Sequence, residues 1–396
     1  MIILGIETSC DETTAAMIEG RGNKVKVLSN IVASQIEIHK KYGGVVPEVA
    51  AREHVLNILP VINEALVKAN LTPALSLVRR RGNIIPRTPR LALRAKRAFI
   101  KGAIDAIAVT VGPGLITSLL VGVETAKILA YVWKLPVIAV NHIEGHIYAN
   151  WLPPISEIFN FTLGLSSGRR QFSIFKNNSK IFPAVILTVS GGHTMLVLMK
   201  GHGKYKTIGE TRDDAAGESF DKAAQLLGLG YPGGPVISAY ADKFNKSKIE
   251  NRKSKITLPR PMIKDNSFDF SFSGLKTALS YQLKQDKNWR NKIPVYAAEF
   301  QQAVIDVLVN KTIKAAIKYQ VKTVMLTGGV AANIELRQQL AYNIKTALSG
   351  VNFIMPDSNY CTDNAAMVAA TGYFKAKRKE YIAWQKLKVK ANLELK

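Results

Sequence analysis

Cysteine is scarce in this sequence, where Cys10 and Cys361 are the only two among 396 residues. Two cysteines so far apart predict a reducing compartment rather than a disulfide scaffold. The amino-terminal stretch lacks the basic segment of a signal peptide and becomes acidic almost at once. The longest apolar run, 115–130, is interrupted by Glu124 and Lys127, which makes it a poor membrane span. Together these absences predict a cytoplasmic protein.

Acidic residues are also few, because 29 Asp and Glu stand against 54 Lys and Arg, for a net charge of +25. Such an excess predicts a polyanionic partner, with nucleic acid as the first candidate and a solvated basic surface as the alternative. Segment 78–101 resembles an insertion, and removing its nine basic residues still leaves a charge of +16. The polar stretch 151–180 is predicted to be a loop, and the basic tail 375–396 a surface helix.

The length of the chain favours two domains, and its 47% apolar residues suffice for well-packed cores. The patterning suggests that the two domains are copies of one plan. Two apolar runs joined by a polar turn are expected at 2–18, and a similar pair, joined by Ser190-Gly191-Gly192, at 184–199. Each pair is followed by a strand, a glycine turn and a helix, at 105–133 and again at 322–348.

A duplicated α/β unit with a central cleft is the plan of the actin, sugar-kinase and Hsp70 class, so we predict this two-lobed fold. In this class the phosphates of a nucleotide lie between the lobes. Glycine turns let backbone N–H groups approach phosphate, and a helix that begins beside them adds a favourable dipole. The turns at 112–114, 190–192 and 328–329 are therefore candidate phosphate sites, although each of them could be a plain turn.

Two of the six histidines, His142 and His146, stand four residues apart. On a helix both rings lie on one face and can bind a single metal ion, while two ordinary half-buried imidazoles are the alternative. A metalloprotease helix would carry its glutamate directly after the first histidine, but Ile143 occupies that place. The acid here is Glu144, which is about 200° around the helix from His142 and faces away from the metal. The pattern thus predicts a metal site without a protease base.

Ten motifs in a fixed order resemble those of the TsaD-type tRNA threonylcarbamoyltransferases, formerly described as O-sialoglycoprotein endopeptidases. The resemblance covers most of residues 1–375. The motifs are Gly5-Ile-Glu-Thr-Ser-Cys-Asp-Glu-Thr13, Gly43-Gly-Val-Val-Pro-Glu48, Gly112-Pro-Gly-Leu115, Asn141-His-Ile-Glu-Gly-His146, Val189-Ser-Gly-Gly-His-Thr194, Asp213-Asp-Ala-Ala-Gly-Glu218, Tyr231-Pro-Gly-Gly234, Ser271-Phe-Ser-Gly-Leu-Lys-Thr277, Gly328-Gly-Val-Ala-Ala-Asn333 and Cys361-Thr-Asp-Asn364.

The resemblance implies transfer of a threonylcarbamoyl group from threonylcarbamoyl-AMP to tRNA. The acceptor would be the N6 amine of the adenosine 3′ of the anticodon, in tRNAs that read codons beginning with A. It also implies the actin-like fold already predicted. The expected partners are a TsaB-like degenerate paralogue and a TsaE-like small ATPase, with the donor supplied by a TsaC-type synthase. The cleft could also bind ATP or ADP.

The resemblance further implies one divalent metal ion, Fe²⁺ in the first place and Zn²⁺ as the alternative, held by His142, His146 and Asp363. Without the family, Asp363 would be a helix N-cap. Asp11 and Glu12, in the first polar turn, could orient the acceptor amine or a metal, or could be solvated turn residues. The implied substrate-binding residues are Thr188, Val189, Ser190, Gly191, Gly192, Asp221, Gly234 and Asn333.

These expectations place the amino-terminal lobe at 1–140 plus 364–396 and the second lobe, with most metal and substrate residues, at 141–363.

Three other functional classes stay open at this stage. A metal-dependent glycoprotease would explain the histidines but lacks the adjacent glutamate. An actin-like small-molecule kinase would share the cleft but leaves the histidine pair without a role. A nucleotide-dependent scaffold without enzymatic activity would act only within a complex.

Overall fold

Two five-stranded sheets organise the part of the chain that the computed structural model describes, which is residues 1–71, 103–153, 181–246 and 256–396. The basic insert 78–101 and the loop predicted at 151–180 lie outside these ranges, except for residues 151–153. The first sheet has the order β3-β2-β1-β4-β5, antiparallel from β1 to β3 and parallel from β1 to β5. Its strands are β1 (Ile2–Glu7), β2 (Glu12–Arg21), β3 (Lys24–Ser34), β4 (Ala106–Gly112) and β5 (Val137–Asn141).

The second sheet repeats this plan in the order β8-β7-β6-β9-β10. Again the earliest strand is central, with two antiparallel neighbours on one side and two parallel strands on the other. The predicted duplication and the actin-like α/β fold class are therefore confirmed. The strands are β6 (Ala184–Val189), β7 (Thr194–Gly201), β8 (Lys204–Glu210), β9 (Thr323–Thr327) and β10 (Asn352–Ile354).

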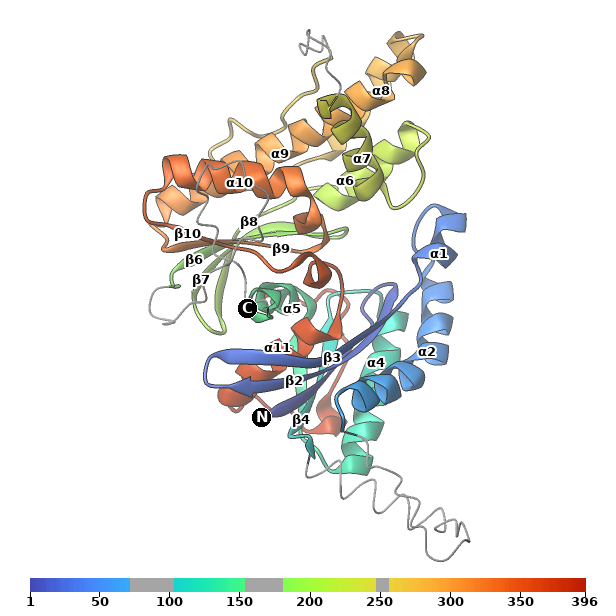
Figure 1. Cartoon of the computed structure of the whole chain (residues 1–396), viewed down its shortest axis with the longest axis vertical. Coiled ribbons are helices and arrows are strands. Elements are labelled where there is room, and N and C mark those ends of the chain that lie inside the picture. Colours follow the sequence, from blue (N-terminus) through green and yellow to red (C-terminus); the bar gives the residue numbers. More distant parts are fainter. Residues whose placement is uncertain (72–102, 154–180, 247–255) are drawn as a thin grey trace, which may run out of the picture. The chain divides into compact units, whose positions relative to one another are not determined.

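Helices cover both faces of the first sheet (Figure 1). Because side chains alternate along a strand, Leu4 and Ile6 pack toward α2 and α4, whereas Gly5 lies against α11. A Cβ on Gly5 would come within 2.2 Å of the Ala365 carbonyl oxygen, so the glycine lets α11 lie close to the sheet. The helices of this unit are α2 (Pro47–Lys68), α4 (Ile116–Trp133), α5 (His142–Tyr148) and α11 (Ala365–Lys377).

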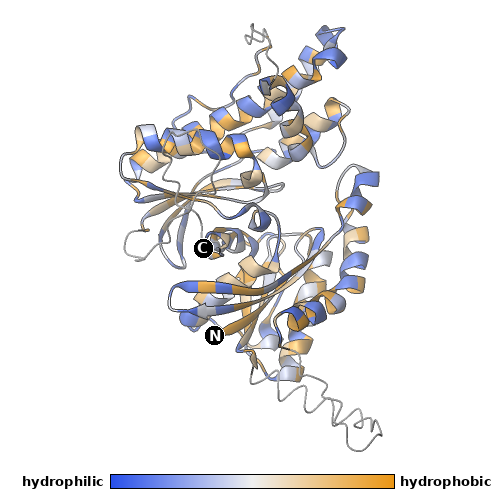
Figure 2. Ribbon diagram, in the orientation of Figure 1, coloured by the Kyte–Doolittle hydropathy of each residue, from blue (hydrophilic) through white to orange (hydrophobic). Residues whose placement is uncertain are grey.

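The second sheet packs one face against a layer of helices, and hydrophobic residues concentrate between them (Figure 2). Phe220 and Phe300 meet edge to face at 5.7 Å between ring centroids in this core. The helices are α6 (Ala216–Leu226), α7 (Gly233–Lys246), α8 (Ser273–Gln285), α9 (Ile293–Lys318) and α10 (Ile334–Ala347). A short helix, α1 (Ile36–His39), clusters with this unit.

The structure divides the chain at other positions than the predicted ones. One unit contains residues 1–35, 45–153 and 363–394, and the other contains 36–44, 154–362 and 395–396. The segment that follows residue 140 stays with the first sheet because α5 begins directly after β5 and packs on α11. His142, His146 and Asp363 therefore all belong to the first unit, not to a second lobe that begins at residue 141.

The carboxyl-terminal tail is not the predicted surface helix. Helix α11 ends at Lys377, and Ile382 then pairs with Val137 of β5 as an isolated bridge. Beyond a short 3₁₀ turn, Leu387 is fully buried, and Val389 and Leu393 pack on the same core. Apolar residues at every second position suit an extended chain that faces a core, which explains the alternation seen in the sequence.

Helix α4 is the one helix among the described residues that is long and apolar enough to cross a membrane. It packs on β4 and α2, and seven of its residues are buried. It also carries the Lys127–Glu124 ion pair, at 2.7 Å. These features are those of a helix that packs on the sheet of a globular unit.

Candidate metal centre and substrate turns

Helix α5 positions the two histidines. The Asn141 side chain accepts hydrogen bonds from the backbone N–H groups of Ile143, at 2.8 Å, and Glu144, at 3.2 Å. This N-cap starts the helix at His142, directly at the end of β5. The four-residue spacing then places His142 and His146 on one face, with ring centroids 4.6 Å apart. The helical spacing predicted from the sequence is confirmed.

Asp363 meets this pair from the loop that leads into α11. Its Oδ1 lies 3.5 Å from His142 Nε2 and 3.2 Å from His146 Nε2. One ligand atom from each of the three residues lies within 4.8 Å of the others. The cap of α11 is the neighbouring Asn364, whose side chain accepts from Met367 N, so Asp363 is not the N-cap. Two imidazole nitrogens and one carboxylate form a donor set suited to Fe²⁺ or Zn²⁺.

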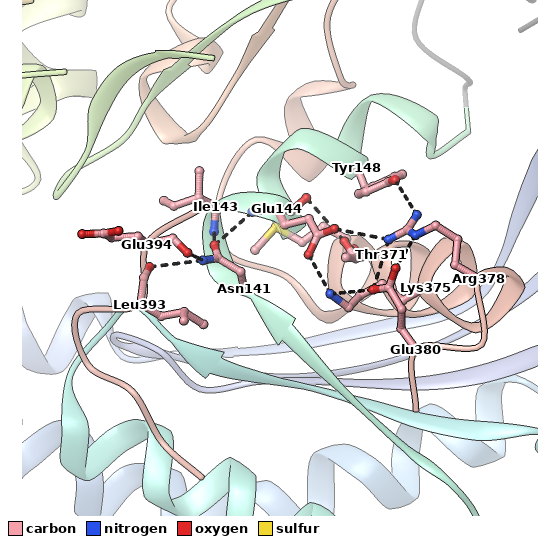
Figure 3. Close-up of polar contacts among 11 residues, drawn as sticks. Asn141, Ile143, Glu144, Tyr148, Thr371, Lys375, Arg378, Glu380, Leu393 and Glu394 are labelled. Carbon is pink, nitrogen blue, oxygen red and sulfur yellow. Dashed lines mark hydrogen bonds and ion pairs between the residues drawn. The ribbon is translucent and has the colours of Figure 1, made fainter. Parts of the chain in front are cut away.

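Glu144 lies on the opposite side of α5 and takes part in an ion-pair network (Figure 3). Its carboxylate is 3.3 Å from Lys375 Nζ and 3.8 Å from an Arg378 nitrogen, while both cations also pair with Glu380. Because this carboxylate is 4% exposed and held by α11, it does not face the histidines. The prediction that Glu144 is not a base for a metal-bound water is consistent with this placement.

A buried carboxylate stands behind His142. Glu7, at the end of β1, accepts from His142 Nδ1 at 3.1 Å and from the Thr110 hydroxyl at 2.7 Å. Its other oxygen accepts from Ser9 N at 2.6 Å. A histidine that donates through Nδ1 presents Nε2 as its metal ligand, and here Nε2 points toward Asp363. The sequence motif contained Glu7, but nothing in a linear sequence indicates that it lies beside a residue 135 positions later.

The charges of these groups are coupled. Burial lowers the pKa of His142, but the negative charges of Asp363 and Glu7 overcome this and raise it to about 9. Burial likewise raises the pKa of Glu7, yet the charge of His142 lowers it overall. Without metal, the two residues therefore form an imidazolium–carboxylate pair at neutral pH.

This pair predicts a steep pH dependence of metal binding. A metal ion must displace the proton of His142, so the apparent affinity should rise about tenfold per pH unit up to a pH of about 9. Above that pH the imidazole is neutral and the profile should flatten. Competition with a chromophoric chelator across this range measures the effect. A flat profile below pH 9 would contradict it.

The turn between β1 and β2 is fixed by His54 of α2, which the sequence pattern did not single out. The Thr13 hydroxyl donates to His54 Nδ1 at 2.7 Å, and His54 Nε2 donates to the Cys10 carbonyl at 2.9 Å. His54 is fully buried. A lone histidine within an amphipathic helix carries no local sign of such a contact, so only the fold reveals it.

Glu12 is the first residue of β2, and its side chain is mostly buried beside this turn. Burial raises the pKa of Glu12 to about 8, although a hydrogen bond from the Ser34 hydroxyl, at 2.8 Å, lowers it. The neighbouring charge of Asp11 also raises it. Glu12 is thus a carboxyl group that can exchange a proton near neutral pH, which a solvated turn residue would not do.

The glycine turn at 112–114 does not serve as the predicted phosphate site. The tail passes over it: Lys390 N donates to Val111 O at 2.8 Å, and Gly114 N donates to Ala391 O at 3.1 Å. Gly112 has a φ of +147°, and a Cβ there would lie 1.8 Å from the Lys390 carbonyl oxygen. The glycines therefore allow the tail, rather than a phosphate, to approach the backbone.

The tail also contacts the start of α5, the helix that carries His142 and His146. The side-chain amide of its N-cap, Asn141, donates to Leu393 O at 3.2 Å and Glu394 O at 3.1 Å (Figure 3).

Replacing Gly112 with alanine should displace the tail, because the positive φ of Gly112 and its contact with Lys390 both exclude a Cβ. We expect faster proteolysis after residue 386 and weaker metal binding. Limited proteolysis with mass spectrometry tests this, and Gly22→Ala, a positive-φ glycine with an open Cβ position, is the control. Equal cleavage of both variants would refute the prediction.

In the second unit, the 190–192 turn, Gly328 and the start of α6 come together. A Cβ on Gly328 would lie 2.3 Å from Val189 O, and one on Gly217 would lie 2.6 Å from Ser190 O. Around Gly191 and Gly192, no described residue lies within 4 Å of an added Cβ. Two glycine turns and a helix N-terminus at the end of a strand form an arrangement that can bind phosphate.

The other predicted substrate residues have structural partners as well. Asp221 Oδ1 accepts from Gly233 N at 2.6 Å, which holds the turn before Gly234 against α6. Asn333 caps α10 by accepting from Leu336 N at 2.9 Å. Thr188 and Val189, at the end of β6, are fully buried, so only their backbone could face a ligand; the full predicted set in this unit is Thr188, Val189, Ser190, Gly191, Gly192, Asp221, Gly234 and Asn333.

Comparisons with known proteins place these features in a family context. The family model described as TsaD, tRNA N6-adenosine threonylcarbamoyltransferase, matches residues 26–78, 92–181 and 172–370. The chain is 46% identical to the protein of that name from Thermomicrobium roseum, across 96% of this chain and 93% of the relative. It is 44% identical to the one from Bacillus subtilis, across 94% of this chain and 90% of the relative. Among solved structures, HypF of T. kodakarensis superposes with a TM-score of 0.52 at 12% identity, covering 98% of this chain and 48% of HypF.

Proposed function

Because the chain belongs to the family of tRNA N6-adenosine threonylcarbamoyltransferases, we propose that it transfers the threonylcarbamoyl group of threonylcarbamoyl-AMP to tRNA. The acceptor is the N6 amine of the adenosine 3′ of the anticodon, in tRNAs that read codons beginning with A. The protein is thus an acyltransferase that modifies tRNA. Its charge of +25 suits a polyanionic substrate.

The observation that carries the mechanism is the convergence of His142, His146 and Asp363 at one point of the first unit. These residues would hold one divalent ion, Fe²⁺ in the first place because two histidines and one carboxylate suit it, with Zn²⁺ as the alternative. When bound, the ion supplies Lewis acidity toward oxygen atoms of the donor. Glu7 keeps the His142 ring oriented toward this point.

We assign the AMP portion of the donor to the glycine turns of the second unit. Backbone N–H groups of the 190–192 turn and of Gly328 would bind the phosphate, supported by the start of α6. Asp221 offers a carboxylate to ribose hydroxyls, and Asn333 and Gly234 lie on neighbouring turns of the same unit. The open space at Gly191 and Gly192 supports this assignment.

The reaction forms a bond between the adenosine N6 and the carbamoyl carbon. The bond from that carbon to the phosphate oxygen breaks, and AMP leaves with the electron pair. The amine must lose one proton, and Glu12, whose pKa lies near 8, is suited to accept it. Asp11, the adjacent carboxylate, would help orient the amine. The donor is a mixed anhydride that is already activated, so positioning and charge neutralisation carry most of the catalysis.

The competing functions lack support from the site. A metalloprotease of the His-Glu-x-x-His type would need its glutamate directly after the first histidine, where Ile143 stands, and Glu144 instead pairs with Lys375 and Arg378. A small-molecule kinase leaves the histidine–aspartate cluster without a role. The deciding experiment supplies the protein and its partners with tRNA, threonine, bicarbonate, ATP and the synthase that forms threonylcarbamoyl-AMP. Mass spectrometry of digested tRNA should then detect threonylcarbamoyladenosine, and its absence under these conditions would sink the proposal.

The full reaction also involves other proteins. We propose a TsaB-like paralogue and a TsaE-like small ATPase as partners, a TsaC-type synthase as the source of the donor, and the cytoplasm as the location.

The first unit offers a surface for the TsaB-like partner on α2 and α4, which contact each other. Large apolar side chains are exposed on both helices: Val55, Leu56, Leu59, Ile116, Leu120, Ile128 and Tyr131. Exposed apolar patches of this kind mark protein interfaces.

Replacing Leu56 with aspartate tests this surface. Leu56 is 67% exposed, so the change should leave the fold intact while placing a charge within the proposed interface. We expect at least about tenfold weaker binding of the TsaB-like partner, measured by titration calorimetry. Tyr342→Asp, at a residue of α10 that is 60% exposed, is the matched control. If both variants bind the partner equally well, α2 is not part of the interface.

A further inference from the structure

A groove of about 430 Å³ lies in the second unit, at the edge of the sheet where β6 begins. Its lining residues are Phe182, Pro183, Leu198, Lys200, Lys206 and Tyr319. The 190–192 turn stands at the opposite end of β6. Six strand residues separate the two ends, which corresponds to roughly 20 Å. The groove is therefore distinct from the proposed AMP-binding turns.

The groove exists because α9 ends before the sheet does. Leu198 belongs to the core beneath the helices, and Lys200, which stands at an irregularity in the β7–β8 pairing between Met199 and Gly201, lines the same groove. Lys206 of β8 is the register partner of Leu198. Helix α9 stops at Lys318, so Tyr319 closes one side and the lysines reach solvent.

The aromatic rings of the groove are held in place by neighbouring rings. Phe182 contacts His202 edge to face, with 5.2 Å between ring centroids. Tyr319 packs on Phe268 at 6.1 Å, and Lys318 Nζ lies 5.2 Å from the centre of the Phe268 ring. The groove thus combines positioned aromatic faces with lysine ammonium groups.

The charged residues that line the groove, Lys200 and Lys206, are both positive. The stretches 181–208 and 307–334, which supply the lining residues, contain no Asp or Glu. Acids do occur near Phe268, which packs on Tyr319, and one of them, Asp269, pairs with Arg212. The carboxyl end of α9 carries a partial negative charge that lysines could neutralise, but this charge is only about half of one elementary charge. Lys200 and Lys206 are both exposed, and Lys204, Lys318 and Lys322 lie nearby in the chain. The positive charge therefore greatly exceeds what the helix end requires.

We propose that this groove binds an unpaired nucleotide of the tRNA substrate. Lys200 and Lys206 contact its phosphates, and Phe182 or Tyr319 offers a face for base stacking. Aromatic platforms beside lysines are the means by which proteins bind single-stranded nucleic acid. The inference rests on the proposed function for the identity of the nucleic acid, and it adds a tRNA contact away from the reacting atoms.

The test measures tRNA binding by the full-length protein in the absence of donor. Fluorescence anisotropy reports the affinity over a range of salt concentrations. For the double variant Lys200→Ala/Lys206→Ala we expect about tenfold weaker binding at ~0.1 M salt. The slope of log affinity against log salt should fall by about one per lysine. The charge-matched control is Lys284→Ala/Lys287→Ala, two exposed lysines at the end of α8 and just beyond it. Thermal unfolding verifies that each variant is folded.

Phe182→Leu separates stacking from charge, because it keeps an apolar side chain but removes the ring. It should weaken binding several-fold at every salt concentration and leave the slope unchanged. Equal losses in the groove and control variants, or no loss in either, would overturn the proposal. Binding is measured without the transfer reaction, so the two proposals can fail separately. If the protein modifies tRNA but its tRNA affinity is unchanged by these substitutions, the groove proposal alone is refuted. If tRNA affinity depends on the groove but no modified nucleoside is formed, the proposed function alone is refuted.

Discussion

His142→Ala is expected to abolish threonylcarbamoyl transfer, with a rate at least about 10³-fold below that of the unmodified protein. The imidazole supplies one of three donor atoms that lie within 4.8 Å of one another, and alanine supplies none. Such a loss corresponds to about 4 kcal/mol of transition-state stabilisation. Transfer is measured by mass spectrometry of tRNA nucleosides, and bound metal by elemental analysis of the same preparation.

Glu144→Gln, on the same helix, is the matched control for this variant. It removes the charge that pairs with Lys375 and Arg378 but leaves the face of His142 and His146 unchanged. We expect a lower melting temperature with metal content and transfer close to normal, because a buried ion pair is broken. Normal transfer by His142→Ala after metal removal would refute the metal site. Loss of transfer in a folded, metal-loaded Glu144→Gln variant would reopen the protease-like role of this residue.

Glu7→Gln should weaken metal binding by about 10–100-fold without unfolding the protein. Glu7 accepts three hydrogen bonds, from His142, Thr110 and Ser9. An amide that still accepts from Ser9 turns its NH₂ group toward His142 Nδ1. The Ser9 hydroxyl, 3.1 Å from Nδ1, can still accept a proton from that nitrogen, but the carboxylate no longer fixes the tautomer. The form with its proton on Nε2, the nitrogen that must bind the metal, therefore becomes more populated and competes with metal binding.

Thr110→Val separates the carboxylate from its supporting hydrogen bond. The valine removes the hydroxyl that donates to Glu7 Oε2 at 2.7 Å, yet the carboxylate still faces His142. We expect less than about a threefold change in metal affinity for this variant. In Glu7→Gln the pH profile of metal binding should also move to lower pH, because the charge that raises the pKa of His142 is gone. Metal titrations at several pH values measure both effects, and an unshifted profile would exclude Glu7 as a positioning residue.

Local periodicity explains what could be predicted from the sequence. The hairpin 184–189/194–201, the two strand–glycine–helix units and the α5 histidine pair depend on patterns within about twenty residues. Such patterns are set by backbone geometry, so they survive in any fold that buries the apolar face. The rotation of Glu144 away from His142 follows from the same helical geometry, and the ion pairs with α11 agree with it.

The same local reasoning failed where a feature depended on distant contacts. The turn at 112–114 looked like the phosphate turns of the second unit, but the tail residue Lys390 occupies the space beside it. The tail alternates polar and apolar residues because it lies extended on a core, and the sequence does not show which core. Asp363 resembled a helix cap until Asn364 proved to be the residue that bonds to the helix start.

The sequence by itself determined the repeated α/β unit, the four-residue histidine spacing and the strongly basic charge, because each depends only on residue identity and short-range geometry. The family resemblance implied that Asp363 joins His142 and His146, but only the tertiary structure shows that the three residues meet within one unit and that Glu7 orients His142 from behind. These contacts join residues separated by 135 or more positions, and their geometry arises from how β1, α5 and α11 pack together. The packing also decides where basic residues meet fixed aromatic rings, as Lys200 and Lys206 do beside Phe182.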